Sequence, residues 1–596
     1  MSLPKDLTLR ALLENSITHH AKRPAVSYVG QQPMTYQEVK SGVDRVQSLL
    51  AARGIDKGDR VALLSQNMPN WVVAYLGITG MGAVVVPILV DFTSEEIVNI
   101  LRHSEASCVV VSEKQAEKLK QPLPDSLHSA ILIETLSEIS LGSLEYNGSP
   151  EPIKRDELIS VESVESLLSR PKEEDMAAIL YTSGTTGKPK GVMLSHRNII
   201  SNAINTLGIQ PVTSEDRLLS VLPLPHTYEC TIGFIIPFMV GGSIYYLDKL
   251  PTPTVLLPAL QKVKPTMMLT VPLIMEKIYQ NRVVPKLKGS PLMRRLGRFR
   301  PAQKFLHKMA GKKIYKAFGG KLHFFGIGGA KLDASAELFL RDAGFPYAIG
   351  YGLTETSPLL AGCGPHLTKY RSTGVNLPNQ ELKILNADPD TGEGEIIARG
   401  PHVMMGYYKE PELTRDVFTD EGWFKTGDLG SMDKDGYLYI KGRIKNIIVT
   451  GTGENVYPED IEAIFNSEQS VLESLVYEIR GKLVAKVHLN YEEIDKRYHE
   501  LKERADQRYD ELKQSADQHY HGLKESAGQS YQEFKDSAIQ LYEQAQEKVN
   551  KQLDEIKERV NARLNRFSRI NIIKEQPEPF EKTPTKKIKR FLYHQE

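Results

Sequence analysis

The sequence predicts an α/β protein with a large N-terminal domain and a small α+β C-terminal domain that carries a long helical insertion. Three observations predict this class. Residues 1–440 alternate short β-branched runs with longer helical patterns, which is typical of α/β layers with buried, mostly parallel sheets. A turn cluster at 386–395 indicates a β-rich subdomain within the large domain. An eleven-residue repeat within 491–566 predicts the helical insertion.

Early in the chain, apolar runs and helical patterns follow one another at short intervals. Residues 60–64 form an apolar run that predicts a buried strand, 71–79 show a helical pattern, and 83–87 predict the next strand. Such a succession favours parallel strands joined by helices.

The C-terminal domain is expected to comprise residues 442–596, after an N-terminal domain of residues 1–441. Within it, residues 491–566 contain no proline and repeat every eleven residues. Tyrosine marks the repeat at Tyr498, Tyr509, Tyr520, Tyr531 and Tyr542. Eleven residues fill three helical turns, so the repeat places one narrow apolar stripe on a straight or slightly right-handed helix.

This helical tract has two interpretations. It is either a coiled coil or hairpin used for packing or oligomerisation, or an amphipathic helix that lies on a membrane. Its polar faces carry 14 basic and 17 acidic residues, so anionic lipid would gain little electrostatically, and we favour the protein–protein interpretation. From Val549 onward the apolar residues recur every seven positions, at Val549 and Ile556 and at Leu553 and Val560, which favours left-handed coiling.

Composition excludes several classes of protein. The chain has 596 residues, enough for several domains, and its 75 Lys and Arg nearly balance 74 Asp and Glu, which argues against a nucleic-acid partner. Cys108, Cys230 and Cys363 show no metal-ligand spacing and suit a reducing compartment. No secretory signal or membrane span is visible, so we expect a cytoplasmic protein, soluble or peripherally attached.

The densest chemical signal is the stretch 181–191, Tyr-Thr-Ser-Gly-Thr-Thr-Gly-Lys-Pro-Lys-Gly, which follows an apolar run. Its glycines free backbone N–H groups, its hydroxyls add donors and its lysines add charge, a combination that suits a phosphate. The stretch is not a Walker A loop, because only two residues separate its first glycines and Pro189 follows Lys188. We expect a strand–loop–strand hairpin; the alternative is an ordinary surface loop.

Four further clusters carry chemistry that is weaker when each is taken alone. Residues 350–356 offer an aromatic ring, a hydroxyl and a carboxylate, and 423–428 end in an acid suited to ribose hydroxyls. Residues 442–446 combine a fixed cation with a flexible joint before the glycine turn 450–455. The basic stretch 583–590 could by itself be a solvated tail.

Together and in this order, the five segments resemble the AMP-forming adenylating superfamily, which includes acyl-CoA synthetases, firefly luciferase and the adenylation domains of nonribosomal peptide synthetases. The resemblance spans the chain except for 491–566. Residues 271–279, 319–322 and 583–590 are most similar to long-chain fatty-acid–CoA ligases.

The resemblance implies two half-reactions. A fatty carboxylate attacks the α-phosphate of Mg·ATP to give acyl-adenylate and pyrophosphate; the C-terminal domain then rotates as a lid, and coenzyme A takes the acyl group and releases AMP. ATP, Mg²⁺, coenzyme A and a long-chain fatty acid are therefore the expected ligands. The alternatives are a fatty acyl-AMP ligase that serves a carrier protein and a catalytically silent coiled-coil scaffold.

The resemblance also assigns roles residue by residue. The expected phosphate ligands are Thr182, Ser183, Gly184, Thr185, Thr186, Gly187 and Lys188. The residues expected around adenine and ribose are Gly329, Ala330, Tyr351, Asp428 and Arg443. Thr354 is expected at the α-phosphate, Glu355 at Mg²⁺, Lys445 at the hinge and Lys587 at the reacting carboxylate. His226 matches a position beside the acyl carboxylate, although a lone histidine is more often structural.

Two segments bear on a fatty substrate. Residues 231–239 could line an acyl tunnel, but we favour a core helix. Residues 282–321 contain thirteen Lys and Arg and no acidic residue, with apolar side chains between them. A solvated helical face is the alternative to contact with anionic headgroups. We expect a peripheral contact here with the inner face of the cell membrane.

Overall fold

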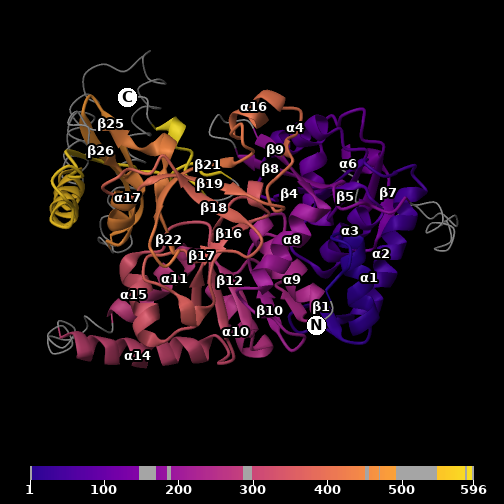
Figure 1. Cartoon of the computed structure of the whole chain (residues 1–596), viewed down its shortest axis with the longest axis horizontal. Helices are drawn as coiled ribbons and strands as arrows, with labels where there is room; N and C mark the ends of the chain where they lie inside the picture. Colours follow the sequence, from indigo (N-terminus) through magenta and orange to yellow (C-terminus); the bar gives the residue numbers. More distant parts are fainter. Residues whose placement is uncertain are drawn as a thin grey trace, which may run out of the picture. The chain divides into compact units, whose positions relative to one another are not determined.

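A computed structural model describes residues 3–145, 169–183, 189–285, 299–449, 455–468, 470–491, 546–583 and 587–593 (Figure 1). The chain divides into two compact units, residues 1–440 and 441–596. The division follows Ile440, one residue before the boundary that the sequence predicts. The α/β class predicted from the sequence is confirmed, with several sheets in the first unit and a smaller mixed sheet in the second.

The first unit contains an eight-stranded sheet in the order β20-β9-β8-β4-β3-β5-β6-β7. Its central strands run parallel, whereas β9, β20 and β7 are antiparallel to their neighbours. The strands are β3 (Arg60–Leu64), β4 (Val84–Ile88), β5 (Cys108–Val111), β6 (Ser129–Leu132), β7 (Ser137–Ile139), β8 (Met176–Ser183), β9 (Pro189–Ser195) and β20 (Gly406–Tyr407).

A second sheet of the first unit has seven strands in the order β14-β13-β12-β10-β11-β1-β2, parallel except at β2. The strands are β1 (Pro24–Tyr28), β2 (Met34–Thr35), β10 (Arg217–Ser220), β11 (Ser243–Tyr246), β12 (Met267–Thr270), β13 (Phe324–Ile327) and β14 (Tyr347–Ile349). Parallel strands require crossover connections, and the helices of the unit supply them.

Helix α3 (Pro69–Gly80) lies between these two sheets, since it contacts β3 and β4 of one and β1 of the other. A helix in this position must be apolar all round, and every residue from Trp71 to Gly80 is buried. Trp71 stacks on Tyr75 with ring centroids 5.2 Å apart. The core of the unit is therefore continuous from one sheet to the other.

The remaining helices of the first unit cover the sheets or join their strands (Figure 1). They are α1 (Leu9–His20), α2 (Tyr36–Ala51), α4 (Ser94–Ser104), α5 (Glu113–Ala116), α6 (Leu141–Glu145), α8 (His196–Leu207), α9 (Ile236–Met239), α10 (Pro253–Val263), α11 (Pro272–Ile278), α14 (Arg300–Ala317), α15 (Ala334–Ala343) and α16 (Pro411–Asp416). Two π-helical turns, η2 (Tyr228–Ile235) and η3 (Tyr279–Val283), and the short 3₁₀ turns η1 (Glu117–Leu119), η4 (Thr354–Thr356) and η5 (Pro365–Leu367) complete them.

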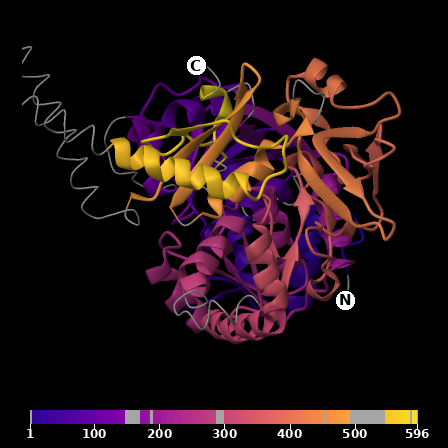
Figure 2. The ribbon, with the colours of Figure 1, turned by 90° about the vertical axis from the view of Figure 1, so that its left-hand side faces the viewer.

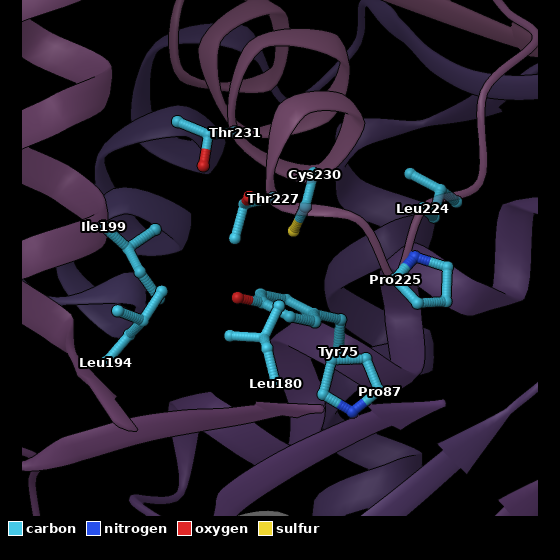
Figure 3. Close-up of a pocket in the computed structure, with 10 residues that line it drawn as sticks. All are labelled: Tyr75, Pro87, Leu180, Leu194, Ile199, Leu224, Pro225, Thr227, Cys230 and Thr231. Carbon is cyan, nitrogen blue, oxygen red and sulfur yellow. The ribbon is translucent and has the colours of Figure 1, made fainter. Parts of the chain in front are cut away.

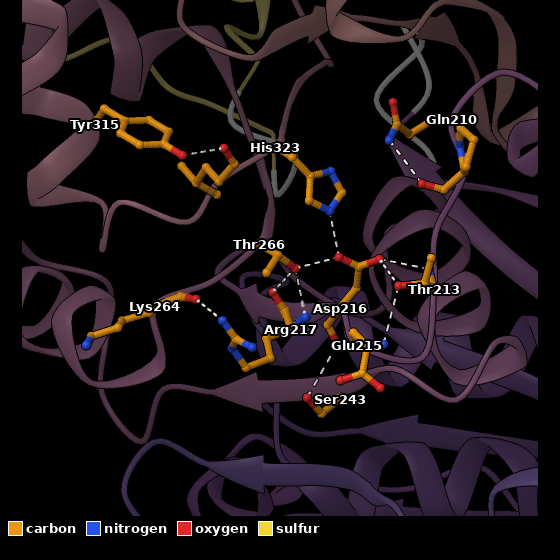
Figure 4. Close-up of polar contacts among 12 residues, drawn as sticks. Gln210, Thr213, Glu215, Asp216, Arg217, Ser243, Lys264, Thr266, Tyr315 and His323 are labelled. Atoms are coloured by element: carbon orange, nitrogen blue, oxygen red, sulfur yellow. Dashed lines mark hydrogen bonds and ion pairs between the residues drawn. The ribbon is translucent and has the colours of Figure 1, made fainter.

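A buried carboxylate joins the amino ends of three neighbouring parallel strands. Asp216 precedes β10, and it accepts hydrogen bonds from Thr266 (2.7 Å), just before β12, and from His323 (2.6 Å), just before β13 (Figure 4). Although burial acts in the opposite direction, the hydrogen bonds from His323, Thr213 and Thr266 lower the pKa of Asp216 to about 2. This network holds the edge of the sheet opposite the carboxyl ends of the strands.

The β-rich subdomain expected from the turn cluster at 386–395 is formed by short antiparallel strands. They are β15 (Tyr351–Gly352), β16 (Leu359–Gly362) and β17 (Val375–Asn376) in one sheet, and β18 (Glu381–Leu385), β19 (Gly394–Arg399), β21 (Phe424–Met432) and β22 (Leu438–Arg443) in another. The turn cluster connects β18 to β19, as the sequence predicts.

The second unit is built on β25 (Val471–Ile479) and β26 (Lys482–Leu489), which are antiparallel, with β27 (Ile572–Glu575) parallel to β26. Its smaller elements are η6 (Ile444–Asn446), β23 (Ile448–Val449), β24 (Asn455–Val456), α17 (Pro458–Asn466) and η7 (Arg590–Leu592). Residues 546–561 form the helix that leads from β26 toward β27, drawn in yellow in Figure 2.

This helix changes the interpretation of the heptad spacing after Val549. Val549, Leu553, Ile556 and Val560 are all buried in one core with β25 and β26, so they pack on their own unit and not on a coiled-coil partner. Because parallel strands need a crossover, residues 546–561 belong to the domain itself, although the sequence places them in the insertion. The tyrosine-marked repeats lie outside the described residues.

Candidate functional site

The carboxyl ends of the parallel strands in the seven-stranded sheet bring several predicted residues to one edge. Gly329 and Ala330 follow β13, and Tyr351 follows β14; the two strands are paired, with Ile327 opposite Ile349. His226 follows β10 on the same side of the sheet. In open α/β sheets ligands bind outside the carboxyl ends of the strands, so this edge is where a site is expected.

Gly329 has a physical reason to be glycine. Its φ is +88°, a left-handed conformation that side chains rarely adopt. Its neighbour Gly328 lies against the ring of Tyr228, where an added Cβ would be 3.1 Å from the ring. The backbone of this turn is thus held close to η2 and leaves the strand in a fixed direction.

The turn that carries Thr354 and Glu355 is locked from both sides. Gly352 packs against the Pro358 carbonyl so closely that a Cβ would collide with it. The Asn202 amide on α8 donates to the carbonyls of Thr356 (3.2 Å) and Leu359 (2.8 Å), and accepts from the Leu359 N–H. These contacts fix the direction in which η4 presents its hydroxyl and carboxylate.

Glu355 lies beside the base of the hairpin that the sequence predicts for a phosphate. The Tyr407 hydroxyl donates to Glu355 Oε1 (3.0 Å), and the Met404 N–H donates to the Glu355 carbonyl (2.9 Å). Tyr407 is held on β20, next to β9, and Lys190 Nζ lies 5.5 Å from the centre of its ring. One contact chain therefore runs from the hairpin through Tyr407 to Glu355.

The hairpin itself is confirmed. Strands β8 and β9 are antiparallel, and Thr182 pairs with Lys190 and Ser183 with Pro189 at its end. The tip, Gly184, Thr185, Thr186, Gly187 and Lys188, lies outside the described residues. Their role at phosphate remains the expectation drawn from the resemblance.

Tyr351 and Asp428, both expected around the nucleoside, are in direct contact. The Tyr351 hydroxyl donates to Asp428 Oδ2 with a distance of 2.7 Å. Asp428 lies on β21 next to a register shift against β19, where Gly427 adopts a φ of +70°. Bulges of this kind redirect a side chain, and here the carboxylate meets the aromatic ring.

An apolar cavity lies beside η4, the turn that carries Thr354 and Glu355 (Figure 3). Its lining comes from α3, β4, β8, β9, α8, η2 and the segment that precedes η2. It consists of Tyr75, Pro87, Leu180, Leu194, Ile199, Leu224, Pro225, Thr227, Cys230 and Thr231. The Thr231 hydroxyl also donates to the Ser357 carbonyl (3.1 Å), one residue beyond η4. The cavity and the carboxylate turn are therefore joined by a hydrogen bond. The free volume of the cavity is about 10 Å³, which is enough for about one water molecule.

His226 lies between two residues that line this cavity, Pro225 and Thr227. The Tyr228 N–H donates to His226 Nδ1 (3.2 Å), which shows that this nitrogen accepts locally. Residues 231–239, for which a core helix was favoured, combine both roles: Phe234 and Phe238 are fully buried, whereas Thr231 lines the cavity.

Three predicted residues belong to the second unit. Arg443 ends β22 and Lys445 lies in η6, whereas the Lys587 N–H donates to Thr583 Oγ1 (3.1 Å). Arg590 forms an ion pair with the buried Glu462 and so attaches this terminal segment to α17. The ion pair with Glu462 gives Arg590 a structural role, which agrees with the prediction that Lys587, and not Arg590, contacts the reacting carboxylate.

Sequence reasoning missed Tyr407 and Asn202. Each acts through a residue far away in the chain, and neither stands in a motif with recognised chemistry. Thr231 lies in the segment 231–239 that the sequence offers as a possible acyl lining, but its hydrogen bond to Ser357 was not foreseen. A local signal that could have pointed to Tyr407 is Gly406, the residue before it, because glycine often marks a constrained backbone. In the structure Gly406 has a φ of +141°.

The described residues contain no cluster of three or more His, Cys, Asp and Glu that could hold a metal ion. Glu355 is a single carboxylate, and one of its oxygens already accepts from Tyr407. A single carboxylate ligand suits a Mg²⁺ ion that takes most of its other ligands from phosphate and water, which is the usual arrangement at nucleotide sites. None of the described helices combines the length and apolar character needed to cross a bilayer.

Curated relatives match most of the chain. A long-chain-fatty-acid–CoA ligase, FadD15, of Mycobacterium bovis is 31% identical over 453 residues, which cover 72% of this chain and 72% of the relative. The long-chain-fatty-acid–CoA ligase 5 of Rattus norvegicus is 29% identical, with 74% and 69% covered. A putative acyl-CoA synthetase, YngI, of Bacillus subtilis is 28% identical, with 78% and 84% covered.

Solved structures agree on the fold. ATP-bound MatB from Rhodopseudomonas palustris has a TM-score of 0.69 at 23% identity, with 98% of each chain covered. The anthranilate CoA ligase AuaEII in complex with anthranoyl-AMP has a TM-score of 0.71 at 20% identity, with 99% of this chain and 97% of that chain covered. The sequence pattern described as AMP-binding enzyme matches residues 13–408, which include the hairpin, η4 and Tyr407. This protein therefore belongs to the AMP-binding enzyme family of adenylating acid–thiol ligases.

Proposed function

We propose that this protein activates a long-chain fatty acid with ATP to an acyl-adenylate and then transfers the acyl group to coenzyme A. In the first half-reaction a carboxylate oxygen bonds to the α-phosphorus while the bond to pyrophosphate breaks. In the second, the thiol sulfur bonds to the acyl carbon and AMP leaves. The names of FadD15 and of the rat ligase support a long-chain acid as substrate and coenzyme A as acceptor.

The hydrogen bond from Thr231 to the Ser357 carbonyl is the observation that carries this proposal. It joins the apolar cavity to the turn that presents Thr354 and Glu355, so an apolar substrate and a phosphate would meet over a short distance. The cavity is lined almost entirely by aliphatic, aromatic and small side chains, as an acyl chain requires. Because its free space fits about one water, an acyl chain would enter only after the lining side chains move apart.

The polar residues suit the charge that the first half-reaction develops. Attack at the α-phosphate places negative charge on phosphate oxygens, which cations and hydrogen-bond donors stabilise. Thr354 would donate to the α-phosphate, the hairpin would hold the outer phosphates, and Asp428 would accept from the ribose hydroxyls. Glu355 would hold Mg²⁺, whose contribution when bound is to neutralise phosphate charge.

The acceptor is tested by measuring AMP release with palmitate, with and without coenzyme A. We expect sustained turnover only with coenzyme A, together with the appearance of palmitoyl-CoA. Sustained AMP release on a carrier protein but not on coenzyme A would identify a fatty acyl-AMP ligase instead. No adenylation of any acid would favour a scaffold.

The acyl site is tested by changing the cavity wall at Ile199, which is buried on α8. Ile199→Phe should make the cavity smaller and lower kcat/KM for palmitate more than for butyrate. Ile199→Ala should make the cavity wider and shift the ratio of the two kcat/KM values toward palmitate. Both variants should destabilise the fold by about 1–5 kcal/mol, so the informative quantity is the ratio of kcat/KM for palmitate to kcat/KM for butyrate. An unchanged ratio in both variants would place the acyl chain elsewhere.

A further inference from the structure

Helix α14 lies at one edge of the first unit, where its last turn contacts α10 (Figure 1). One side of it is fixed to α15. His307 Nδ1 and Arg300 Nη1 each lie 2.8 Å from Asp342 Oδ2, and Gly311 packs so closely on Ala343 that a Cβ would collide. The orientation of α14 about its own axis is therefore fixed by the side it buries.

The opposite side of α14 is exposed and has an ordered pattern. At about 100° per residue, the exposed positions span roughly half the helix circumference, with two apolar side chains near its centre and lysines around them. The exposed lysines are Lys304, Lys308, Lys312, Lys313 and Lys316, and the apolar side chains are Phe305 and Met309.

The charge on this side is not neutralised locally. Residues 299–321 contain no Asp or Glu, and the α14 lysines form no ion pair with any other residue in the described ranges. Some lysines elsewhere do form ion pairs, such as Lys40 with Asp44 and Lys57 with Asp175. A one-signed surface of this kind attracts anions in a protein whose formal net charge is only +1.

The apolar side chains are exposed to an unusual degree. Phe305 is 64% exposed and Met309 50%, and Phe299, just before the helix, is 65% exposed. On α10, Gln261 donates to the Lys316 carbonyl (3.0 Å), and Leu257 on the same helix is 42% exposed. The two helices therefore present apolar side chains and lysines at one edge of the unit.

We propose that the exposed side of α14 binds the surface of an anionic lipid bilayer. Lysine side chains would contact headgroup phosphates while Phe305 and Met309 enter the boundary with the acyl chains. A bilayer uses both properties of the surface, because burial of the apolar groups adds to the attraction of the lysines. The sequence predicts a membrane contact over 282–321; the described residues narrow the contact to α14 and its flank, and 286–298 lie outside them.

Co-sedimentation with vesicles tests the proposal on the full chain without ATP or acyl substrate, so its failure would leave the ligase proposal intact. The wild type should bind vesicles of phosphatidylcholine and phosphatidylglycerol and not those of phosphatidylcholine alone. The triple variant Lys304→Glu, Lys308→Glu and Lys312→Glu should lose at least about a hundredfold in affinity. Phe305→Ala with Met309→Ala should also weaken binding, because the apolar term is lost.

A matched control places the same charge change elsewhere. Lys114, Lys172 and Lys434 are exposed in the first unit outside α14 and α10, and their substitution by glutamate should leave vesicle binding within about twofold. Equal losses in the control and the α14 triple variant would show general charge attraction and overturn the proposal. So would unchanged vesicle binding in the α14 variant, or a surface that binds a DNA duplex through these lysines and not vesicles.

Discussion

Among single residues, Tyr407 offers the sharpest test of the site because it contacts Glu355 without standing in any recognised motif. Tyr407→Phe removes one hydrogen bond to a carboxylate, which contributes about 1.5–3 kcal/mol when the partner is charged. We therefore expect kcat/KM for acyl-dependent pyrophosphate exchange to fall by about 10- to 100-fold, with a higher Mg²⁺ requirement. Glu355→Gln should cost more.

Tyr408 provides the matched control for that measurement. It adjoins Tyr407 in the chain, but its ring lies near Lys409 and His103 and packs against a different hydrophobic core from that of Tyr407. Tyr408→Phe should leave both kcat/KM and the Mg²⁺ requirement close to wild type. If the two variants behave alike, the Tyr407 hydroxyl does not position Glu355.

A second residue-scale prediction concerns Glu229, which is fully buried on η2. Burial raises its pKa to about 8, so the carboxyl is mostly neutral in the folded protein at pH 7. An unfolded glutamate ionises above pH 4.5, so the wild type loses folding stability as pH rises from about 4.5 to 8. Glu229→Gln removes this dependence. The difference in unfolding free energy between the variant and wild type should therefore shift in favour of the variant by about 3–4 kcal/mol from pH 5 to pH 8.

Tryptophan fluorescence makes this measurement specific to one unit. The chain has two tryptophans, Trp71 and Trp423, and both lie in residues 1–440. Denaturation followed by fluorescence at pH 5 and pH 8 therefore reports on the unit that contains Glu229. The exposed Glu412 serves as control, and a Glu229→Gln curve parallel to wild type would contradict a neutral Glu229.

At the scale of secondary-structure elements, what the sequence predicts well is what short-range periodicity determines. The strand predicted at 60–64 is β3, the helix at 71–79 is α3 (Pro69–Gly80), and the strand at 83–87 is β4 (Val84–Ile88). Strand β8 and its turn into β9 were predictable because Pro189 and the following apolar run disfavour a helix.

What the sequence does not predict is which element buries a given apolar stripe. The heptad spacing at 549–560 suits a coiled coil, yet the same side chains fill the core beside β25 and β26. Tyr407 and Glu355 are 52 residues apart, and Tyr351 and Asp428 are 77 apart. Such pairings depend on strand order, which local pattern does not reveal.

The Asp216 network gives the prediction for this scale, since it joins β10, β12 and β13 at their amino ends. The pKa of Asp216 is depressed to about 2, so its stabilising contribution is present above the unfolded value of 3.8 and is lost as pH falls toward 2. Asp216→Asn should cost about 1–2 kcal/mol at pH 7, a value discounted because its partner His323 is 45% exposed, and progressively less below pH 4. Asp390→Asn on an exposed turn is the control; an equal loss at pH 7 and pH 2.5 would contradict the electrostatic origin.

At the scale of the whole molecule, the predicted site residues are divided between the two units. The residues for phosphate, adenine and Mg²⁺ lie in 1–440, whereas Arg443, Lys445 and Lys587 lie in 441–596. The proposed reaction also has two separable halves, adenylation and thioester formation. If the resemblance assigns Lys587 correctly, loss of this one lysine should affect the first half and spare the second.

Lys587→Ala should therefore lower acyl-dependent pyrophosphate exchange on the order of a hundredfold or more, because a cation near the developing phosphate charge is lost. Thioester formation from supplied palmitoyl-adenylate and coenzyme A should stay close to wild type. Lys589→Ala is the matched control, because Lys589 Nζ lies 3.8 Å from Glu581 Oε2 within the same unit. This variant should keep close to wild-type activity in both assays. Equal losses in both half-reactions would indicate a damaged second unit, and normal adenylation in Lys587→Ala would show that another group supplies the charge.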